Sequence, residues 1–450
     1  MAKFAFKITD ERIVTATGLA FAGNILEGSG LRKKLNSMDK TDKRSSHQIA
    51  DGDIAATFIS LACMGKPDFC AVNELIEEPA FYKEALNIKR IAAEETLRQR
   101  MDSIGDTRRD AILESNVKLL QKNHVALTPD AHGFVVLDID VTPQDNTKTK
   151  KEGVSRTYKS NVDGFAPIMA YLSKDGYLIN TELRAGSQHC QKDTPAFLKE
   201  TIGIAQQLTD EKLLVRLDSG NDAAENIDIL INRGCDFIIK RNLRQEDPEW
   251  WFEHLARDCK DIRTPREGKK VYVGSTWKET SYTDGDGKVH SNYVKIVYEI
   301  IERTIDKEGQ HLLVHDLETN MFWTNTPYSN QEVINSYHAH GESEQYHSEF
   351  KTDMGLERLP SGRFATNALV MELGMMAYNI LRIIGQQAAR MDDSPMRKTA
   401  FRRRLRTVIM NLIMAPSHVT IHARKTWVGL GCVNSWRHTI MRLSKIFHLS

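Results

Sequence analysis

The feature that most constrains this chain is a series of short apolar segments between residues 133 and 240. Strand-like segments come first, and helical and strand-like segments then alternate. The first three, at 133–142, 165–172 and 177–183, are typical of strands. The polar turn at 173–176 indicates that the last two form a hairpin. We therefore expect these three strands to pair as an antiparallel meander.

Two helix and strand pairs follow the meander. Helical periodicity at 193–208 and 221–234 is interrupted by a buried strand at 213–218 and followed by another at 235–240. Crossover helices of this kind add the later strands in parallel. The resulting order of elements resembles that of the ribonuclease H-like fold, so we predict an α/β core of this type.

The segments around this core have a different character. Residues 1–125 show helical periodicity, which predicts either a helical DNA-binding region or a plain helical bundle. Residues 126–385 are expected to form the core domain, interrupted at about 241–325 by a β-rich insertion with polar turns. Residues 386–450 predict a basic, helical C-terminal region.

Charge is spread unevenly over the 450 residues. The formal net charge is only +1, yet after Gln386 the chain has many arginines and lysines and only Asp392 and Asp393 as acidic residues. The densest basic cluster is Arg402, Arg403 and Arg404. A cationic tail on an otherwise acidic chain suggests a polyanionic partner. A solvated basic helix without a partner is the alternative.

Composition disfavours several classes of protein. The first residues lack the apolar core of a signal peptide, and no stretch approaches the roughly 18 uninterrupted apolar residues of a membrane helix. The six cysteines are scattered and contain no Cys-x-x-Cys pair, so neither a zinc knuckle nor a disulfide framework is indicated. We expect a cytoplasmic protein with no membrane partner.

Aspartates mark two of the predicted strands. In the first strand Asp138 and Asp140 share a face with apolar side chains, where a carboxylate is costly to bury unless it is paired or binds a cation. Asp218 closes the strand 213–218, at the end where ligands gather in α/β sheets. An aspartate that merely caps a turn is the alternative for Asp218.

A predicted helix beginning near Asn330 supplies a third carboxylate. Taking about 100° per residue, four of its side chains fall within roughly 60° of one another, whereas Glu342 and Glu349 fall on the other side. The four residues that share this stripe are Tyr337, His340, Glu344 and Lys351. Mg²⁺ and Mn²⁺ prefer oxygen ligands such as these carboxylates, and a pair of such ions suits phosphodiester displacement.

These residues carry a family resemblance. The helix reads Tyr337-(2)-His340-(3)-Glu344-(6)-Lys351, which resembles the Tyr-(2)-Arg-(3)-Glu-(6)-Lys signature of a large group of insertion-sequence DDE transposases. Asp140-Val141-Thr142 is similar to the Asp-x-Thr motif of that group, and Asp218 to its second aspartate. The run at 164–189 and the β-rich insertion also resemble the group.

The resemblance implies a ribonuclease H-like catalytic domain that binds Mg²⁺, or Mn²⁺ in its place, through Asp140, Asp218 and Glu344. It implies DNA cleavage and strand transfer at the terminal inverted repeats of a mobile element, by a homodimer that synapses two ends. Tyr337 and Lys351 would then contact DNA. His340 stands where the family has arginine, and a neutral imidazole holds phosphate less well than a guanidinium.

The resemblance also implies an aromatic side chain in the insertion that stacks on a displaced base. Trp277 and Trp323 are candidates, although ordinary core tryptophans are the simpler expectation.

Three alternatives stay open at this point. The first is a metal-dependent nuclease without strand transfer, and the second is a decayed, non-catalytic DNA-binding relative. The third is a zinc hydrolase using His338, His340 and His347, which lacks the His-Glu-x-x-His spacing. For the first strand, Asp138 is the alternative to Asp140.

Overall fold

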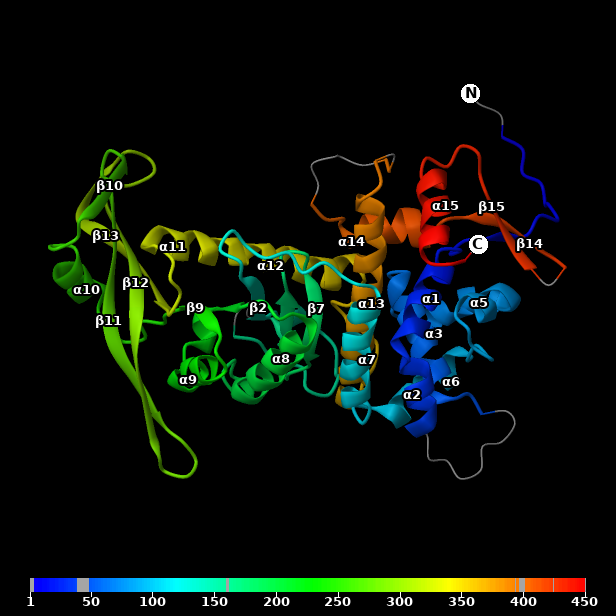
Figure 1. Ribbon diagram of the computed structural model, residues 1–450, viewed down its shortest axis with the longest axis horizontal. Coiled ribbons are helices and arrows are strands. Elements are labelled where there is room, and N and C mark those ends of the chain that lie inside the picture. The colour runs from blue at the N-terminus through cyan, green and yellow to red at the C-terminus, as the bar shows by residue number, and fades with distance from the viewer. Residues whose placement is uncertain are drawn as a thin grey trace.

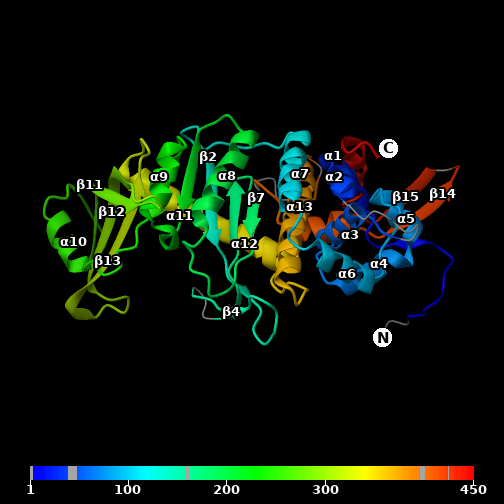
Figure 2. The same ribbon diagram turned by 90° about the horizontal axis from the view of Figure 1, so that it is seen from below.

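The computed structural model describes residues 4–38, 48–158, 162–392, 394–395, 401–423 and 425–449. Figure 1 shows three parts in a row along the long axis, namely a β-rich insertion, a central mixed sheet and a helical region that contains both ends of the chain. Figure 2 shows the same order from below.

The central sheet has the strand order that the sequence predicts. Its five core strands lie in the order β7-β6-β2-β8-β9. They are β2 (Val135–Val141), β6 (Ile168–Leu172), β7 (Tyr177–Glu182), β8 (Leu213–Leu217) and β9 (Asp236–Lys240). β6 runs antiparallel to both β2 and β7, whereas β8 is parallel to β2 and to β9. The prediction of an α/β, ribonuclease H-like core is confirmed.

The two faces of this sheet are covered by different helices. Val135, Leu137 and Ile139 point into the main core, while Phe134 and Leu214 belong to a smaller core on the other face. The main core includes side chains of α8 (Thr194–Leu208) and α9 (Ala224–Asn232). The smaller core includes side chains of α11 (Asn330–His338), which runs along the opposite side in Figure 1. The even-numbered positions of β2, Asp138 and Asp140 among them, therefore face α11.

A tight turn joins β6 to β7 and contacts Tyr346 of α12 (Glu342–Ser348). Ser173 and Gly176 have φ of 63° and 72°. A Cβ on Gly176 would lie 2.6 Å from the ring of Tyr346, so the turn needs glycine both for its left-handed backbone and for the close approach. The Tyr346 hydroxyl donates to the carbonyl of Lys174 over 3.0 Å.

The insertion continues the sheet instead of forming a separate layer. It consists of α10 (Pro248–Leu255), β10 (Asp261–Arg266), β11 (Lys269–Thr283), β12 (Val289–Ile305) and β13 (His311–Thr324). β13 pairs antiparallel with β9, with Phe322 opposite Lys240, so one sheet of nine strands crosses both parts.

The N-terminal region is helical. Its helices are α1 (Leu19–Ser29), α2 (Leu31–Met38), α3 (Asp51–Cys63), α4 (Val72–Glu77), α5 (Pro79–Ala85), α6 (Glu94–Ile104) and α7 (Arg109–Lys122). Among them α1, α3, α6 and α7 pack against α13 (Phe364–Ala389), which also lies against β7. By length and composition α13 is apolar enough to cross a membrane, but 94% of its most apolar window is buried inside the protein, as expected of a core helix.

The C-terminal region contains a hairpin that the sequence analysis did not predict. After α14 (Leu405–Val408) come β14 (Ser417–His422) and β15 (Lys425–Leu430), and α15 (Arg437–Ile446) follows. The short strand β1 (Ile13–Val14) pairs with β14, so the sheet order is β1-β14-β15. Both ends of the chain thus lie in one structural unit (Figure 1).

Candidate catalytic site

Asp140 and Asp218 lie side by side at the carboxyl ends of parallel strands. In the β2–β8 ladder Ile139 is opposite Leu217, so the next residues on both strands are Asp140 and Asp218. Asp140 is 8% exposed, and Asp218 is partly buried. Asp218 Oδ1 accepts hydrogen bonds from Gly220 N at 3.1 Å and Asn221 Nδ2 at 2.8 Å. Asp218 therefore caps the following turn and faces the site at the same time.

Asp138 is a structural carboxylate. It is 5% exposed and accepts bonds of 2.6 Å from both Nε and Nη2 of Arg216. His340 Nδ1 lies 2.7 Å from Asp138 Oδ1, and Arg216 Nη1 reaches the carbonyl of Ser336. Burial works against ionisation, but the charges of Arg216 and His340 lower the Asp138 pKa to about 2. This network ties β2 and β8 to α11, so the charge of Asp138 is already balanced by structural partners.

His340 has a different environment from the one that the sequence stripe predicts. Its ring is 7% exposed and faces Asp138, so it lies under the helix and not on an open DNA-facing surface. Burial lowers the His340 pKa, but contact with Asp138 outweighs this and raises it. The imidazole of His340 thus already has Asp138 as its partner, and a DNA phosphate would have to compete with that carboxylate.

Tyr337 and Lys351 lie near the same end of β2. Burial raises the Tyr337 pKa, and the charges of Asp218 and Asp140 raise it further. Lys351 Nζ donates to the carbonyl of Pro143 over 2.6 Å and lies 3.2 Å from a carboxylate oxygen of Glu357.

The helix that carries the signature is not a single regular helix. α11 is followed by a 3₁₀ turn at Ala339–Gly341, then by α12 (Glu342–Ser348) and a π-helical turn at Glu349–Asp353. A constant 100° per residue therefore does not hold along the stripe.

The irregular turns change which side chain meets the aspartates. His347 is 5% exposed, and its Nε2 lies 3.6 Å from Asp140 Oδ2. Glu344 is exposed, and its side chain makes no hydrogen bond or ion pair with any residue that the structure describes. Within those described ranges, no three His, Cys, Asp or Glu side chains gather closely enough to hold a metal ion. The structure thus brings Asp140 and Asp218 together and leaves Glu344 apart from them.

Glu349 has a purely structural environment, in agreement with its place off the predicted stripe. It is fully buried and pairs with Arg382 of α13 and, over 3.0 Å, with Arg402. Arg402 also lies over the Tyr346 ring, 4.3 Å from its centroid, and Arg404 pairs with Asp353 over 2.9 Å.

The predicted basic cluster of Arg402, Arg403 and Arg404 therefore packs against the π-helical turn. Two of its three charges meet carboxylates there, and burial lowers the pKa of Arg403. Contact between these arginines and DNA stays a prediction.

Comparison with known families decides the class of the protein. The family model described as "Transposase DDE domain group 1" matches residues 3–450. The chain belongs to this transposase family. The family agrees with the resemblance carried by the signature helix and by the two aspartate strands.

A solved structure similar to this transposase is the "Cryo-EM structure of piggyBac transposase synaptic complex with hairpin DNA (SNHP)". The two chains share 12% identity, the match covers 89% of this chain and 80% of the other, and the TM-score is 0.42. No curated protein gives a significant match.

Two residues near Asp218 of the transposase escaped the sequence analysis. The Cys190 thiol lies 2.7 Å from the carbonyl of Gly220, and burial together with Asp218 raises its pKa. Tyr158 has a raised pKa because of burial and the nearby charges of Asp218, Cys190 and Asp140. Both residues lie in irregular loops, where periodicity carries no signal.

The tryptophans of the insertion differ from each other. Trp323 is 4% exposed and donates from Nε1 to Asp222 over 2.9 Å, so the expectation of a core tryptophan is confirmed for it. For Trp277 that expectation is wrong, because this side chain is 55% exposed and stacks on Tyr293. Trp277 borders a hollow of about 640 Å³ that Trp250 and Lys278 also line.

Proposed function

We propose that this transposase cuts and rejoins DNA at the terminal inverted repeats of an insertion sequence, by cut-and-paste transposition. The observation that carries the proposal is the adjacency of Asp140 and Asp218 on neighbouring parallel strands, on the sheet face that packs against α11. Two carboxylates at this edge suit a hard divalent cation.

The donor set fits Mg²⁺, with Mn²⁺ able to substitute. Asp140 and Asp218 would hold the ion, and Glu344 would complete the site. When bound, the metal would activate the attacking oxygen and stabilise the leaving one. Glu344 and His347 are three positions apart in α12, hence about 60° apart around the helix. A modest rotation of α12 between its two irregular turns would bring Glu344 toward the position where His347 now meets Asp140.

The chain's own residues would position the DNA. Tyr337, whose phenol senses the charges of both aspartates, and Lys351 at the end of β2 would contact a phosphate that enters the site. Arg402, Arg403 and Arg404 are the further DNA contacts that we propose. His340 would reach a phosphate only after leaving its buried partner Asp138. The partners would be terminal inverted repeats and target DNA, bound by a homodimer in the cytoplasm of a bacterial cell.

A strand-transfer assay tests the proposal. Labelled terminal-repeat DNA, both intact and pre-cut, is incubated with the protein, Mg²⁺ and a target plasmid. Cleaved ends joined to the target support transposition. Hydrolysis without joined products would instead indicate a nuclease, and specific binding without cleavage would indicate a decayed relative.

A further inference from the structure

The N-terminal arm, residues 4–12, carries apolar side chains that are almost wholly exposed in one copy of the chain. Phe6 and Ile8 are each 99% exposed and Phe4 is 84% exposed. Spaced two residues apart, the three side chains share one face when the arm is extended. Figure 1 shows the arm leaving the fold beside β14. Contiguous exposed apolar side chains of this kind mark a contact surface.

The base of the arm is fixed. Arg12 Nε donates to Glu78 over 2.7 Å, and the Arg12 carbonyl accepts from Val419 N of β14 over 2.9 Å. The arm therefore begins at the β1 edge of the β1-β14-β15 sheet.

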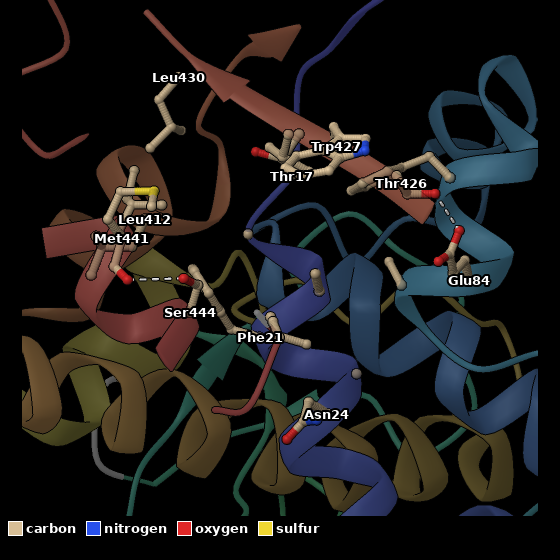
Figure 3. Close-up of a pocket in the computed structure, with 18 of the residues that line it drawn as sticks. Thr17, Phe21, Asn24, Glu84, Leu412, Thr426, Trp427, Leu430, Met441 and Ser444 are labelled. Carbon is tan, nitrogen blue, oxygen red and sulfur yellow. Dashed lines mark hydrogen bonds between the residues drawn. The ribbon is translucent and has the colours of Figure 1, made fainter. Parts of the chain in front are cut away.

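An apolar pocket of about 430 Å³ lies on the β15 side of the same sheet, between α1, β15 and α15. Figure 3 shows Phe21, Leu412, Leu430 and Met441 around it, with Trp427 above. Trp427 and Met441 are 55% and 52% exposed, so the apolar surface continues onto the rim. The volume falls within the range of about 300–1,000 Å³ that is common for binding pockets.

We propose that the N-terminal arm of a second copy of this chain occupies this pocket. The three apolar side chains of the arm span about 13 Å from Phe4 to Ile8, a length suited to a row of contacts along the pocket. The basic lining residue Lys425 lies over the Trp427 ring, 4.9 Å from its centroid.

The backbone of β15 offers a second attachment. Among the described residues β15 pairs only with β14, so its outer edge is open to a further strand. An extended arm that adds there would gain main-chain hydrogen bonds as well as apolar contacts.

The sheet order favours exchange between copies over folding back. A chain's own arm starts at β1, and β14 separates β1 from β15. An arm from a second copy is not tied to β1 of this sheet and can add at the open edge. Reciprocal insertion of two arms gives a closed two-fold dimer. The proposal deepens the homodimer of the proposed function and rests on it for its biological role, but its test needs no DNA.

Sedimentation velocity of the full chain over a concentration series provides the first test. Phe6→Asp in the arm and Met441→Asp at the pocket rim are both at exposed positions, so neither disturbs the core. We expect each to raise the dimer dissociation constant by at least about tenfold. The control is Val314→Asp, which introduces the same charge at a 76% exposed position of β13 in the insertion. Unchanged dimerisation in both arm and rim variants would overturn the proposal.

Cross-linking identifies the source of the arm. One chain carries Phe6→Cys, a second, tagged chain carries Met441→Cys, and both have serine at the exposed cysteines Cys70 and Cys432. Oxidation of the mixture is expected to give a disulfide-linked species with the summed mass. Absence of that species, or an intrachain link alone in a chain with both cysteines, would overturn arm exchange. A strand-transfer assay that still succeeds in Phe6→Asp would show that the DNA chemistry stands without it.

Discussion

Arg216 donates to both carboxylate oxygens of Asp138, over 2.6 Å in each case, two residues before Asp140 on the same strand. The two aspartates share a face of β2 but have different environments. Asp138 is held by a buried guanidinium and by His340, whereas Asp140 lies next to Asp218 at the end of the sheet. Replacing each aspartate by asparagine should therefore have different effects at the two positions.

Asp140→Asn is expected to abolish DNA cleavage while leaving stability and specific end binding largely unchanged, because the amide removes the charge that attracts a cation. Asp138→Asn leaves Arg216 buried without its counter-charge and should destabilise the fold by about 3–5 kcal/mol. Urea unfolding and a cleavage assay on terminal-repeat DNA measure the two effects. An Asp138→Asn protein as stable as the parent would contradict the structural role.

Glu344 and Glu349 form a second matched pair. Glu344→Gln changes an exposed side chain and should keep stability while cleavage is lost, provided that α12 brings Glu344 to the aspartates. Glu349→Gln leaves Arg382 and Arg402 without their buried partner, with an expected loss of about 3–5 kcal/mol. The checks are the urea midpoint and the cleavage rate of each variant. Full cleavage by Glu344→Gln would remove it from the site.

Glu372 of α13 predicts a pH dependence of stability. Burial raises its pKa from 4.5 to about 8, and although Arg109 Nε lies 3.8 Å away, Arg109 bonds to Glu200 and does not offset the burial. Between these pH values the unfolded state is ionised and the folded state is protonated. Stability from this residue is therefore complete below about pH 4.5 and decreases as pH rises to about 8, by at most about 1.4 kcal/mol per unit.

Glu372→Gln should remove that decrease. We expect the variant to show a smaller loss of urea-unfolding free energy between pH 5 and pH 8 than the parent protein. Parallel curves for the two proteins would show that Glu372 ionises freely in the fold.

Gly176→Ala tests the support of α12 from the β6–β7 turn. The added methyl would lie 2.6 Å from the Tyr346 ring at a positive φ, so we expect a loss of about 1–3 kcal/mol. Gly285→Ala serves as control, because a methyl added there would have no neighbouring atom within 4 Å and the φ of Gly285 is not positive. Equal thermal midpoints for both variants would argue against a tight turn.

The order of strands in the core was predictable because burial leaves a local pattern. Alternation in 133–142 and continuous apolar runs in the later strands are direct imprints of faces that pack on a core. The adjacency of Asp140 and Asp218 follows from that order, since the ends of parallel strands meet at one edge.

The path of the signature helix was not predictable in this way. Its 3₁₀ and π-helical turns depend on long-range contacts, above all the burial of Glu349 against Arg382 some thirty residues later. A helical wheel assumes a constant rotation and therefore placed Glu344 where the structure has His347. The exposure of Trp277 was likewise not predictable. A long strand that extends beyond the core keeps its alternating sequence pattern, although no core packs against it there.

The pairing of β13 with β9 has a mechanical consequence. Because the main-chain ladder at Phe322–Thr324 joins the insertion to the strands beside Asp218, the long hairpins cannot swing as a tethered flap. The insertion and the strand next to Asp218 therefore belong to one continuous sheet, and a substrate that displaces the long hairpins would also displace the strands beside the two aspartates.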